Sequence, residues 1–250
     1  MVKRFLTALG EYIFLMNKSL SVPQKRSIFL RVFTREIYDL GVNSFGLVMF
    51  TSVFVGAVIA IQMYNNFEAA ALPIPKVYVG QATKIVLILE FSPTIISLVL
   101  AGKVGSYIAS SIGTMRVSEQ IDALEIMGVN SANFLIFPKI LSCLIFSPLL
   151  IALSMVVGLL GGYFSGLITG NWTTGEYITG VQMFMPNLFI YYAFLKTFVF
   201  AFIIATIPSY YGYYVKGGAL EVGRASTQAV VWTMVFIIIS ELLLTQMILS

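Results

Sequence analysis

Histidine is absent from the chain, and Cys143 is its one cysteine. These shortages exclude disulfide bonds, zinc sites of the Cys/His type, and catalysis in which histidine acts as a base or activates a nucleophile. The phosphate-binding motif G-x-x-x-x-G-K-[ST] is missing as well, so the chain cannot hold a nucleotide by that route. We therefore expect no metal site in this chain.

Charged residues are also scarce, at 10% of the chain against about 25% in typical soluble domains. Hydrophobic residues make up 58% of the 250 residues, and the mean hydropathy is +0.92. These values predict a polytopic, all-α integral membrane protein with no room for a separate soluble domain. The net charge of +4 invites a nucleic-acid interpretation, but the positions of the charges indicate membrane topology instead, and we expect no nucleic-acid partner.

Five apolar segments are long enough to cross a bilayer, because each exceeds the ~17 residues that the hydrocarbon core requires. They cover residues 45–63, 81–101, 140–169, 187–211 and 227–249. Residues 64–80 and 170–186 are expected to be connections on one side of the membrane. Residues 102–139 form a longer central region on the other side.

The N-terminal residues 1–44 have the pattern of helices that lie in the membrane interface. Apolar side chains recur at helical spacing at Phe5, Leu9, Tyr12, Ile13, Met16 and Leu20. Pro23 is expected to end this helix, and a second, basic helix follows it. Glu11 interrupts the apolar run and no small-residue cleavage site follows, so we do not expect a cleavable signal. The chain is therefore divided into elbow helices at 1–44 and a membrane domain at 45–250.

Lysine and arginine are distributed unevenly between the two sides. Seven of the fifteen lie in residues 1–44, three in the central region and two just before the last span. The opposite side has only Lys76 and Lys84. Because cytoplasmic segments carry the excess of basic residues, this predicts a cytoplasmic N-terminus and central region and, after five crossings, an external C-terminus.

A short amphipathic helix is expected in the central region, with Ser118 as its N-cap and Gly128 as its end. Three apolar side chains share one face: Val117, Ile121 and Leu124. Three acidic side chains share another face: Glu119, Asp122 and Glu125. Such a helix would lie flat on the membrane surface and offer its acidic face to a soluble partner. An ordinary solvated loop helix fits the spacing equally well.

Glycine recurs at every fourth position in the third span, at Gly158, Gly162, Gly166 and Gly170. The bare backbone stripe that results lets another helix approach closely. Helix packing, within one protomer or between two, is favoured over a substrate-binding surface.

Three ionisable side chains fall inside the predicted spans: Glu90, Lys196 and Glu241. Each costs about 2.5–3.5 kcal/mol in the membrane unless it is paired or hydrated. With the topology above, all three lie ~12–15 Å below the outer surface. We therefore expect Lys196 to pair with Glu90 or Glu241. The pair would either set the register of the helices or take part in coupling or substrate binding.

The central region carries a long motif. It consists of Gly102-Lys-Val-Gly105, the run IGTMRVSEQIDALEIMG from Ile112 to Gly128, and Pro138-Lys139. This motif is similar to the signature of MlaE-type (YrbE-type) permeases. Further matches to that family are Gln62, Leu89–Pro93, Lys196, Gly223–Thr227 and Glu241, so the resemblance covers nearly the whole chain. It implies a membrane subunit of the MCE-associated ABC transporters, which move phospholipids between bacterial membranes.

Four positions depart from the family pattern. Leu89 stands where an arginine is usual. Ser110-Ser111 stand where Ala-Glu is usual, so Ser111 can offer a head group only a hydrogen bond without charge. Lys139 replaces an arginine, which keeps the charge but loses the bidentate fork.

The resemblance implies a homodimer in the bacterial inner membrane, with elbow helix, five spans and a cytoplasmic coupling helix in each protomer. A cytoplasmic ABC ATPase dimer, which binds ATP and Mg²⁺, would dock on the coupling helix. A periplasmic MCE-domain lipid-binding protein would exchange phospholipid with a cavity between the protomers. The expected coupling residues are Ser118, Glu119, Gln120, Asp122 and Glu125.

The cavity would be lined by residues of the first, second and fifth spans and of the segment that follows the second. The candidates are Val55, Ile59, Gln62, Met63, Ile88, Glu90, Ser92, Ser111 and Ile239. Ordinary helix packing explains the apolar candidates equally well.

The leading hypothesis is thus an ATP-driven phospholipid permease subunit without catalytic chemistry of its own. A proton-coupled secondary transporter that uses Glu90, Lys196 and Glu241 is the alternative. Five spans without an obvious duplication argue against the internal repeat that such a transporter would have. A structural membrane scaffold is a third possibility, and it predicts no partner-dependent activity.

Overall fold

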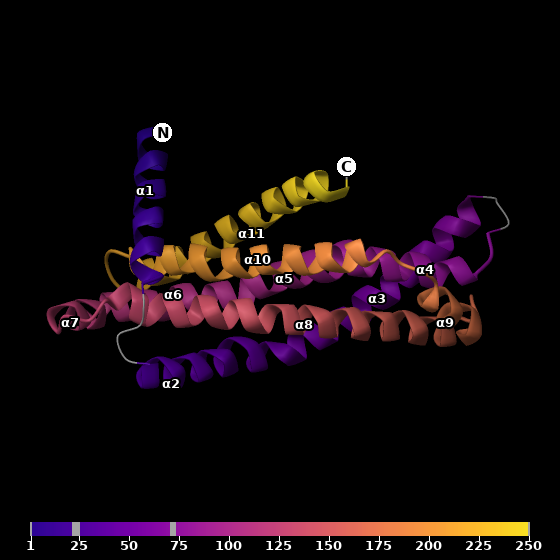
Figure 1. Cartoon of the computed structure of the whole chain (residues 1–250), viewed down its shortest axis with the longest axis horizontal. Helices are drawn as coiled ribbons and strands as arrows, with labels where there is room; N and C mark the ends of the chain where they lie inside the picture. Colours follow the sequence, from indigo (N-terminus) through magenta and orange to yellow (C-terminus); the bar gives the residue numbers. More distant parts are fainter. Residues whose placement is uncertain (1, 22–25, 71–73, 250) are drawn as a thin grey trace. The chain divides into compact units, whose positions relative to one another are not determined.

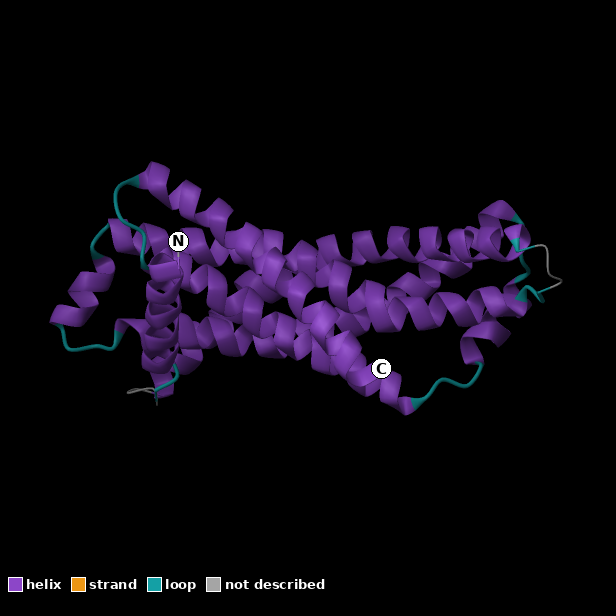
Figure 2. Ribbon diagram, turned by 90° about the horizontal axis from the view of Figure 1, so that it is seen from above, coloured by secondary structure: helices purple, strands orange, loops and turns teal. Residues whose placement is uncertain are grey.

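Helices are the only regular structure in the part of the chain that the structure describes, residues 2–21, 26–70 and 74–249 (Figure 2). Within these described residues, the computed structural model contains five helices that are long and apolar enough to cross a membrane. They cover Ile28–Ala69, Val77–Val117, Ser131–Thr169, Asn187–Tyr213 and Ala219–Met247. The predicted fold class, an all-α membrane protein with five spans, is confirmed.

The first two spans consist of several helical segments joined end to end (Figure 1). The first contains α2 (Arg26–Glu36), the π-helical segment η1 (Ile37–Val42) and α3 (Asn43–Ala69). The second contains α4 (Val77–Val86), η2 (Leu87–Ile95), α5 (Ile96–Leu100), η3 (Ala101–Gly105) and α6 (Ser106–Val117). Within η2, Pro93 has no N–H to donate to the carbonyl of Leu89, which accounts for the local change of helix type.

The remaining spans are single helices, and three shorter helices lie outside the spans. The single helices are α8 (Ser131–Thr169), α10 (Asn187–Tyr213) and α11 (Ala219–Leu249). The shorter ones are α1 (Val2–Ser19), α7 (Gln120–Ile126) and α9 (Thr174–Gln182).

The helices extend further than hydropathy predicts. The basic helix expected as a separate element continues as α2 and η1 into the first span, and α3 runs on to Ala69. The central region shortens to residues 118–130, because α6 and α8 extend into it. Hydropathy detects where side chains become polar, whereas a helix continues until a cap or a helix-breaking residue ends it. Pro23 and Pro73 lie outside the described residues.

The chain forms two compact units, and each is built from separate stretches of sequence. The first unit consists of Met1–Ser44, Leu100–Phe146 and Val199–Ser240. The second unit consists of Phe45–Val99, Ser147–Phe198 and Glu241–Ser250. The segments that the charge distribution assigns to the cytoplasm belong to the first unit, and the connections assigned to the outside belong to the second. The grouping agrees with the two predicted sides, while the orientation stays a prediction.

Glycine permits the close approach of α3 and α8 within the second unit. A Cβ added at Gly56 would overlap the carbonyl group of Gly158. One added at Gly161 would overlap the carbonyl group of Val53. Backbone therefore packs directly on backbone, as small residues allow between membrane helices.

Two further glycines of the repeat face aromatic side chains. Gly162 lies against the hydroxyl of Tyr177, and Gly166 lies against the indole of Trp172. Gly170 differs, because it follows the end of α8 with a φ of 68°. The predicted role of the repeat in helix packing is confirmed within the protomer for Gly158 and Gly162. Gly166 instead contacts Trp172, which lies in the connection between α8 and α9.

The connection predicted at residues 170–186 contains α9, which was not predicted. Thr173 and Glu176 form a capping box, in which the backbone N–H of Thr173 donates to the Glu176 carboxylate at 2.8 Å. Gly80 and Gly180 let α9 pack against α4, since a Cβ at either would overlap the backbone of the other helix. The T-x-x-E pattern is visible in the sequence, so a search for caps would have found this helix.

The N-terminal helix α1 presents an apolar stripe at the surface of the first unit. Leu6, Leu9 and Ile13 are exposed and fall within roughly 60° on the helical wheel. On another side, Tyr12 donates a hydrogen bond of 2.9 Å to Thr206, and Met16 is buried instead of facing outward. An exposed stripe of this kind suits a helix in the membrane interface, which is the role expected for α1.

Candidate functional site

Lys196, Glu90 and Glu241 meet within the second unit and form what we call the charge cluster. Lys196 lies in α10 and is fully buried, whereas Glu90 comes from η2 and Glu241 from α11. The Nζ of Lys196 lies 2.9 Å from Oε2 of Glu90 and 2.5 Å from Oε1 of Glu241. The ammonium therefore contacts both of the partners that sequence analysis considered for it.

The backbone takes up the third donor of Lys196. Its Nζ donates a hydrogen bond of 3.0 Å to the carbonyl oxygen of Leu89. Pro93 cannot donate to this carbonyl as it would in an α-helix, and the lysine provides a side-chain donor to it. The ring of Tyr192 lies 4.4 Å from Nζ, within the range of a cation–π interaction. Each proton of the ammonium thus has an acceptor, which is the condition for tolerating a buried charge.

The charge cluster holds two carboxylates for one ammonium. Glu241 is largely buried, and its Oε2 has no hydrogen-bond partner among the described residues. The side chain of Glu90 is 42% exposed, so its carboxylate also faces the surface of the chain. A proton or a further cation would balance the excess negative charge. The arrangement can tie three helices together, and it can offer a carboxylate to a ligand or to a proton.

A second buried ion pair lies in the first unit. Nζ of Lys139 in α8 is 2.5 Å from Oε1 of Glu36 in α2, and both side chains are largely buried. Oε2 of Glu36 has no partner among the residues that the structure describes. A lysine is a point donor, so it does not serve both oxygens as an arginine fork would.

The expected coupling helix is α7, and its start differs from the prediction. Ser118 is not its N-cap, because the Ser118 hydroxyl donates to the carbonyl of Thr114 and belongs to the end of α6. Glu119 occupies the N-cap position with a left-handed φ of 59°. Gly128, with a φ of 75°, follows the end of the helix as predicted.

Two of the three acidic side chains of α7 are engaged within the chain, which contradicts the predicted free acidic face. Asp122 Oδ1 lies 2.6 Å from Nη1 of Arg116. Glu125 accepts three hydrogen bonds, from Ser131 at 2.7 Å, Tyr213 at 3.0 Å and Lys18 at 3.1 Å. The donors to Glu125 come from α8, α10 and α1, so they could not be predicted from the local sequence of α7.

These donors lower the pKa of Glu125 to about 2, through the hydrogen bond from Ser131 first and that from Lys18 next. The carboxylate is therefore charged at neutral pH and binds α7 to three other helices. We call the group of Lys18, Glu125, Ser131 and Tyr213 the Glu125 anchor.

The outward surface of α7 combines polar and apolar groups. Glu119 and Gln120 are exposed, and Ile126 and Met127 are 87% and 67% exposed. Ile121 is fully buried, so the apolar face packs against the protein and does not lie on the membrane as predicted. A partner that docks here would meet Glu119, Gln120 and an apolar tip formed by Ile126 and Met127.

The cavity candidates differ in exposure. Ile59 and Ser92 are buried inside the protomer, which contradicts their predicted place on an open wall. Apolar residues surround both in the sequence, so periodicity cannot show which side of the helix is covered. Gln62 is exposed and donates a hydrogen bond of 3.0 Å to Asn66. The remaining candidates are half-buried or exposed: Val55, Met63, Ile88, Glu90, Ser111 and Ile239.

Some residues that complete these sites were not predicted. The hydroxyls of Tyr192 and Thr245 lie 2.6 Å apart beside the charge cluster. Ser131 and Tyr213 belong to the Glu125 anchor. No signal in the sequence distinguishes these four from other polar residues in apolar helices, because their partners lie far away along the chain.

Comparison with known proteins finds a family described as Permease MlaE, which matches residues 33–247. A probable ABC transporter permease protein of Rickettsia bellii is 33% identical over 246 residues, which cover 98% of this chain and 93% of that protein. One from Synechocystis sp. is 35% identical over 214 residues, covering 82% of this chain and 77% of that protein. Protein TRIGALACTOSYLDIACYLGLYCEROL 1, chloroplastic, of Arabidopsis thaliana is 31% identical over 228 residues, covering 88% and 62% respectively.

Proposed function

The chain belongs to the MlaE permease family, and we propose that it is the permease subunit of an ATP-driven ABC transporter that moves phospholipids between the inner and outer membranes of a bacterium. The family match and the five spanning helices identify a multi-pass membrane permease, and the resemblance drawn from the central motif is thereby confirmed. One relative is named for trigalactosyldiacylglycerol, a membrane lipid, which supports a lipid as the substrate.

The proposed transporter contains two copies of this chain, a cytoplasmic ABC ATPase dimer and a periplasmic MCE-domain lipid-binding protein. Relatives named as ABC transporter permeases imply the ATPase partner. In this proposal ATP and Mg²⁺ bind to the ATPase, while the permease chain carries out no catalysis and holds no cofactor.

The Glu125 anchor is the observation that carries the proposed coupling. With seven residues, α7 is too short to be a stable helix without tertiary contacts. The anchor binds it through charged hydrogen bonds to α1, α8 and α10. A push on the exposed Glu119, Ile126 or Met127 would then displace the ends of these helices together with α7. Rigid-body motion of this kind is how an ATPase would reshape the permease.

The charge cluster would receive this motion, because α10 carries both Tyr213 of the anchor and Lys196 of the cluster. Lys196 in turn ties η2 and α11 to α10 through Glu90 and Glu241. The exposed part of the Glu90 carboxylate is a polar group inside an apolar span, where it would meet a passing lipid head group or the partner protomer.

The alternative, a proton-coupled secondary transporter, is favoured by one observation. The charge cluster has one carboxylate more than it has cations, and Oε2 of Glu241 has no partner among the described residues. A proton could therefore bind and leave at this site. In that case the purified chain alone would take up substrate in response to a pH gradient.

Reconstitution tests the coupling. The chain is co-expressed with its ATPase, purified, and placed in vesicles with fluorescent phospholipid, and lipid transfer is measured with and without ATP. A double variant, Glu119→Lys with Ile126→Glu, reverses the charge and removes the apolar tip on the outward surface of α7. Glu68→Lys is the matched control, because Glu68 is an exposed acid of the other unit.

We expect the double variant to lose both the ATPase on purification and ATP-dependent transfer, while the control keeps both. Retention of the ATPase by the double variant would contradict the assigned coupling surface. Lipid transfer that needs a pH gradient and no ATPase would establish the alternative instead.

A further inference from the structure

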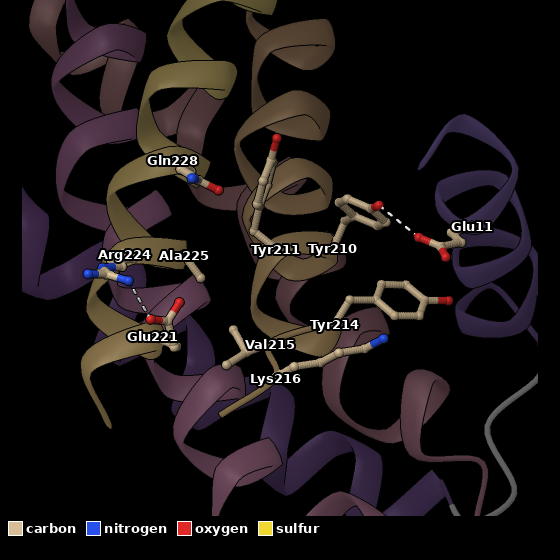
Figure 3. A pocket seen from close by; sticks show the side chains of 10 residues that line it. All are labelled: Glu11, Tyr210, Tyr211, Tyr214, Val215, Lys216, Glu221, Arg224, Ala225 and Gln228. Atoms are coloured by element: carbon tan, nitrogen blue, oxygen red, sulfur yellow. Dashed lines mark hydrogen bonds and ion pairs between the residues drawn. The ribbon is translucent and has the colours of Figure 1, made fainter. Parts of the chain in front are cut away.

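A pocket of about 480 Å³ lies in the first unit and includes no residue of the charge cluster or the Glu125 anchor (Figure 3). Its walls come from the end of α10, the start of α11 and one side of α1. The residues that matter to its chemistry are Glu11, Tyr210, Tyr211, Tyr214, Lys216 and Arg224. Because two spanning helices end here, the pocket lies at the level where lipid head groups meet the water.

The local sequence explains why a pocket forms at this point. Gly217 has a φ of 115°, which a residue with a side chain rarely adopts, and it turns the chain from α10 into α11. Tyr210 lies at the centre of a tyrosine cluster, with ring centroids 5.4 Å from Tyr211 and 5.2 Å from Tyr214. Figure 3 shows Tyr210 and Tyr214 extending toward Glu11, with Lys216 beside Tyr214.

The charges of the pocket are partly unneutralised. Arg224 pairs with Glu221 at 2.7 Å, as an exposed pair one turn apart on α11. Lys216 and Glu11 form no ion pair with any of the described residues, and Glu11 accepts a hydrogen bond of 3.0 Å from the hydroxyl of Tyr210. In Figure 3, Lys216 and Tyr214 extend toward the side on which Glu11 lies. The pocket therefore offers a cation and a carboxylate that have no ion-pair partner in the described part of the chain, on either side of aromatic rings.

We propose that this pocket binds a zwitterionic phosphoethanolamine group, as carried by the head group of phosphatidylethanolamine. The primary ammonium would lie between the Glu11 carboxylate and the tyrosine rings, which attract cations through their faces. The phosphate would accept a hydrogen bond from the ammonium of Lys216, which extends toward the same side as Tyr214 in Figure 3. Tyrosines also gather at membrane surfaces without any ligand, but that tendency does not account for the two unpaired charges beside them.

The inference is independent of the proposed transport, because none of these residues belongs to the charge cluster, the Glu125 anchor or the cavity candidates. A bound head group here would hold α1 to the ends of α10 and α11. The ligand would reach the pocket either as a membrane lipid or as a soluble ester with the same polar group.

Lipid binding to the full chain tests the proposal. The purified, delipidated protein is titrated with phosphatidylethanolamine or phosphatidylglycerol, and bound lipid is counted by native mass spectrometry. Glycerophosphoethanolamine is added as a soluble competitor. The variants are Glu11→Gln, Lys216→Gln and Lys216→Arg. Arg31→Gln is the matched control, because Arg31 is an exposed cation of the same unit outside the pocket. Melting temperatures check that each variant is folded.

We expect Lys216→Gln to weaken the binding of both lipids about tenfold, because one charged hydrogen bond to phosphate is lost. Glu11→Gln should weaken the binding of phosphatidylethanolamine by a similar factor and leave the binding of phosphatidylglycerol unchanged, because only phosphatidylethanolamine carries an ammonium. Lys216→Arg and the control should bind like the wild type. If glycerophosphoethanolamine competes with the lipid, the soluble ester is itself a ligand of the pocket. If it does not compete, the ligand is the membrane lipid.

Equal effects of Glu11→Gln on the two lipids would overturn the assignment of the ammonium. Unchanged binding of both lipids in Lys216→Gln would overturn the pocket as a phosphate site.

Discussion

Removal of the ammonium from the charge cluster is the perturbation that tests most of this structure at once. Lys196→Met keeps a long, unbranched side chain but removes its charge. Glu90 and Glu241 are then left without a counter-charge, and the carbonyl of Leu89 loses its hydrogen bond from the ammonium.

The geometry allows the size of the effect to be worked out. Loss of one partner from a buried pair costs about 3–5 kcal/mol, and we expect the lower end because Glu90 is partly solvated. The two carboxylates should contribute unequally. Glu241 is 16% exposed and 2.5 Å from the ammonium, so Glu241→Gln should cost about 1.5–3 kcal/mol. Glu90→Gln should cost less than about 1 kcal/mol.

Thermal unfolding of the full chain in detergent measures these differences. For a chain of this length, 3 kcal/mol lowers the melting temperature by about 6–12 °C. Lys84→Met is the matched control, because Lys84 is 7% exposed and donates to the Met183 carbonyl without a carboxylate partner. The combined variant Lys196→Met with both Glu→Gln changes should regain most of the loss, since it leaves no unpaired charge.

Two results would refute this reasoning. One is a Lys196→Met protein that melts within about a degree of the wild type. The other is a larger loss from Glu90→Gln than from Glu241→Gln, because the exposed carboxylate would then be the stronger partner.

Three further predictions follow from other contacts. Lowering the pKa of Glu125 from 4.5 to about 2 stabilises the fold above pH 4.5, and this contribution is lost as the pH falls toward about 2. The protection factors of the α7 amides, measured relative to the intrinsic exchange rate at each pH, should therefore fall over this range in the wild type. In Glu125→Gln they should be low already at neutral pH. Protection factors equal to those of the wild type would contradict the anchor. Lys139→Arg should stabilise the fold by roughly 1 kcal/mol and so raise the melting temperature, because the guanidinium can also donate to the second carboxylate oxygen of Glu36. A melting temperature below that of the wild type would mean that the site has no room for the guanidinium. Gly56→Ala should lower the free energy of unfolding by about 1–3 kcal/mol, because the added methyl group overlaps α8. Gly46 has open space around it, so Gly46→Ala should stabilise the helix by up to about 1 kcal/mol. Equal shifts in the melting temperatures of the two variants would argue against the close approach of α3 and α8.

The number of spans, the fold class and the family could be derived from the sequence alone. Long apolar runs are sufficient for the first two, because a bilayer accepts only segments whose backbone is satisfied within a helix. The family followed from one continuous motif between Ile112 and Gly128. An ion pair of Lys196 with Glu90 or Glu241 was also predicted, because charged groups at one depth of an apolar medium have few other partners, whereas the contact with both came from the structure.

The contacts of the α7 side chains with the rest of the chain were decided only by the tertiary structure. Its helical spacing shows which side chains share a face, but not that Ser131, Tyr213 and Lys18 meet at Glu125, since these donors come from distant parts of the chain. The same holds for the burial of Ile59, where every neighbouring residue is apolar and no contrast marks the covered side. A sequence pattern reports the preferences of one segment, whereas a partner in space depends on how separate segments fold back on one another.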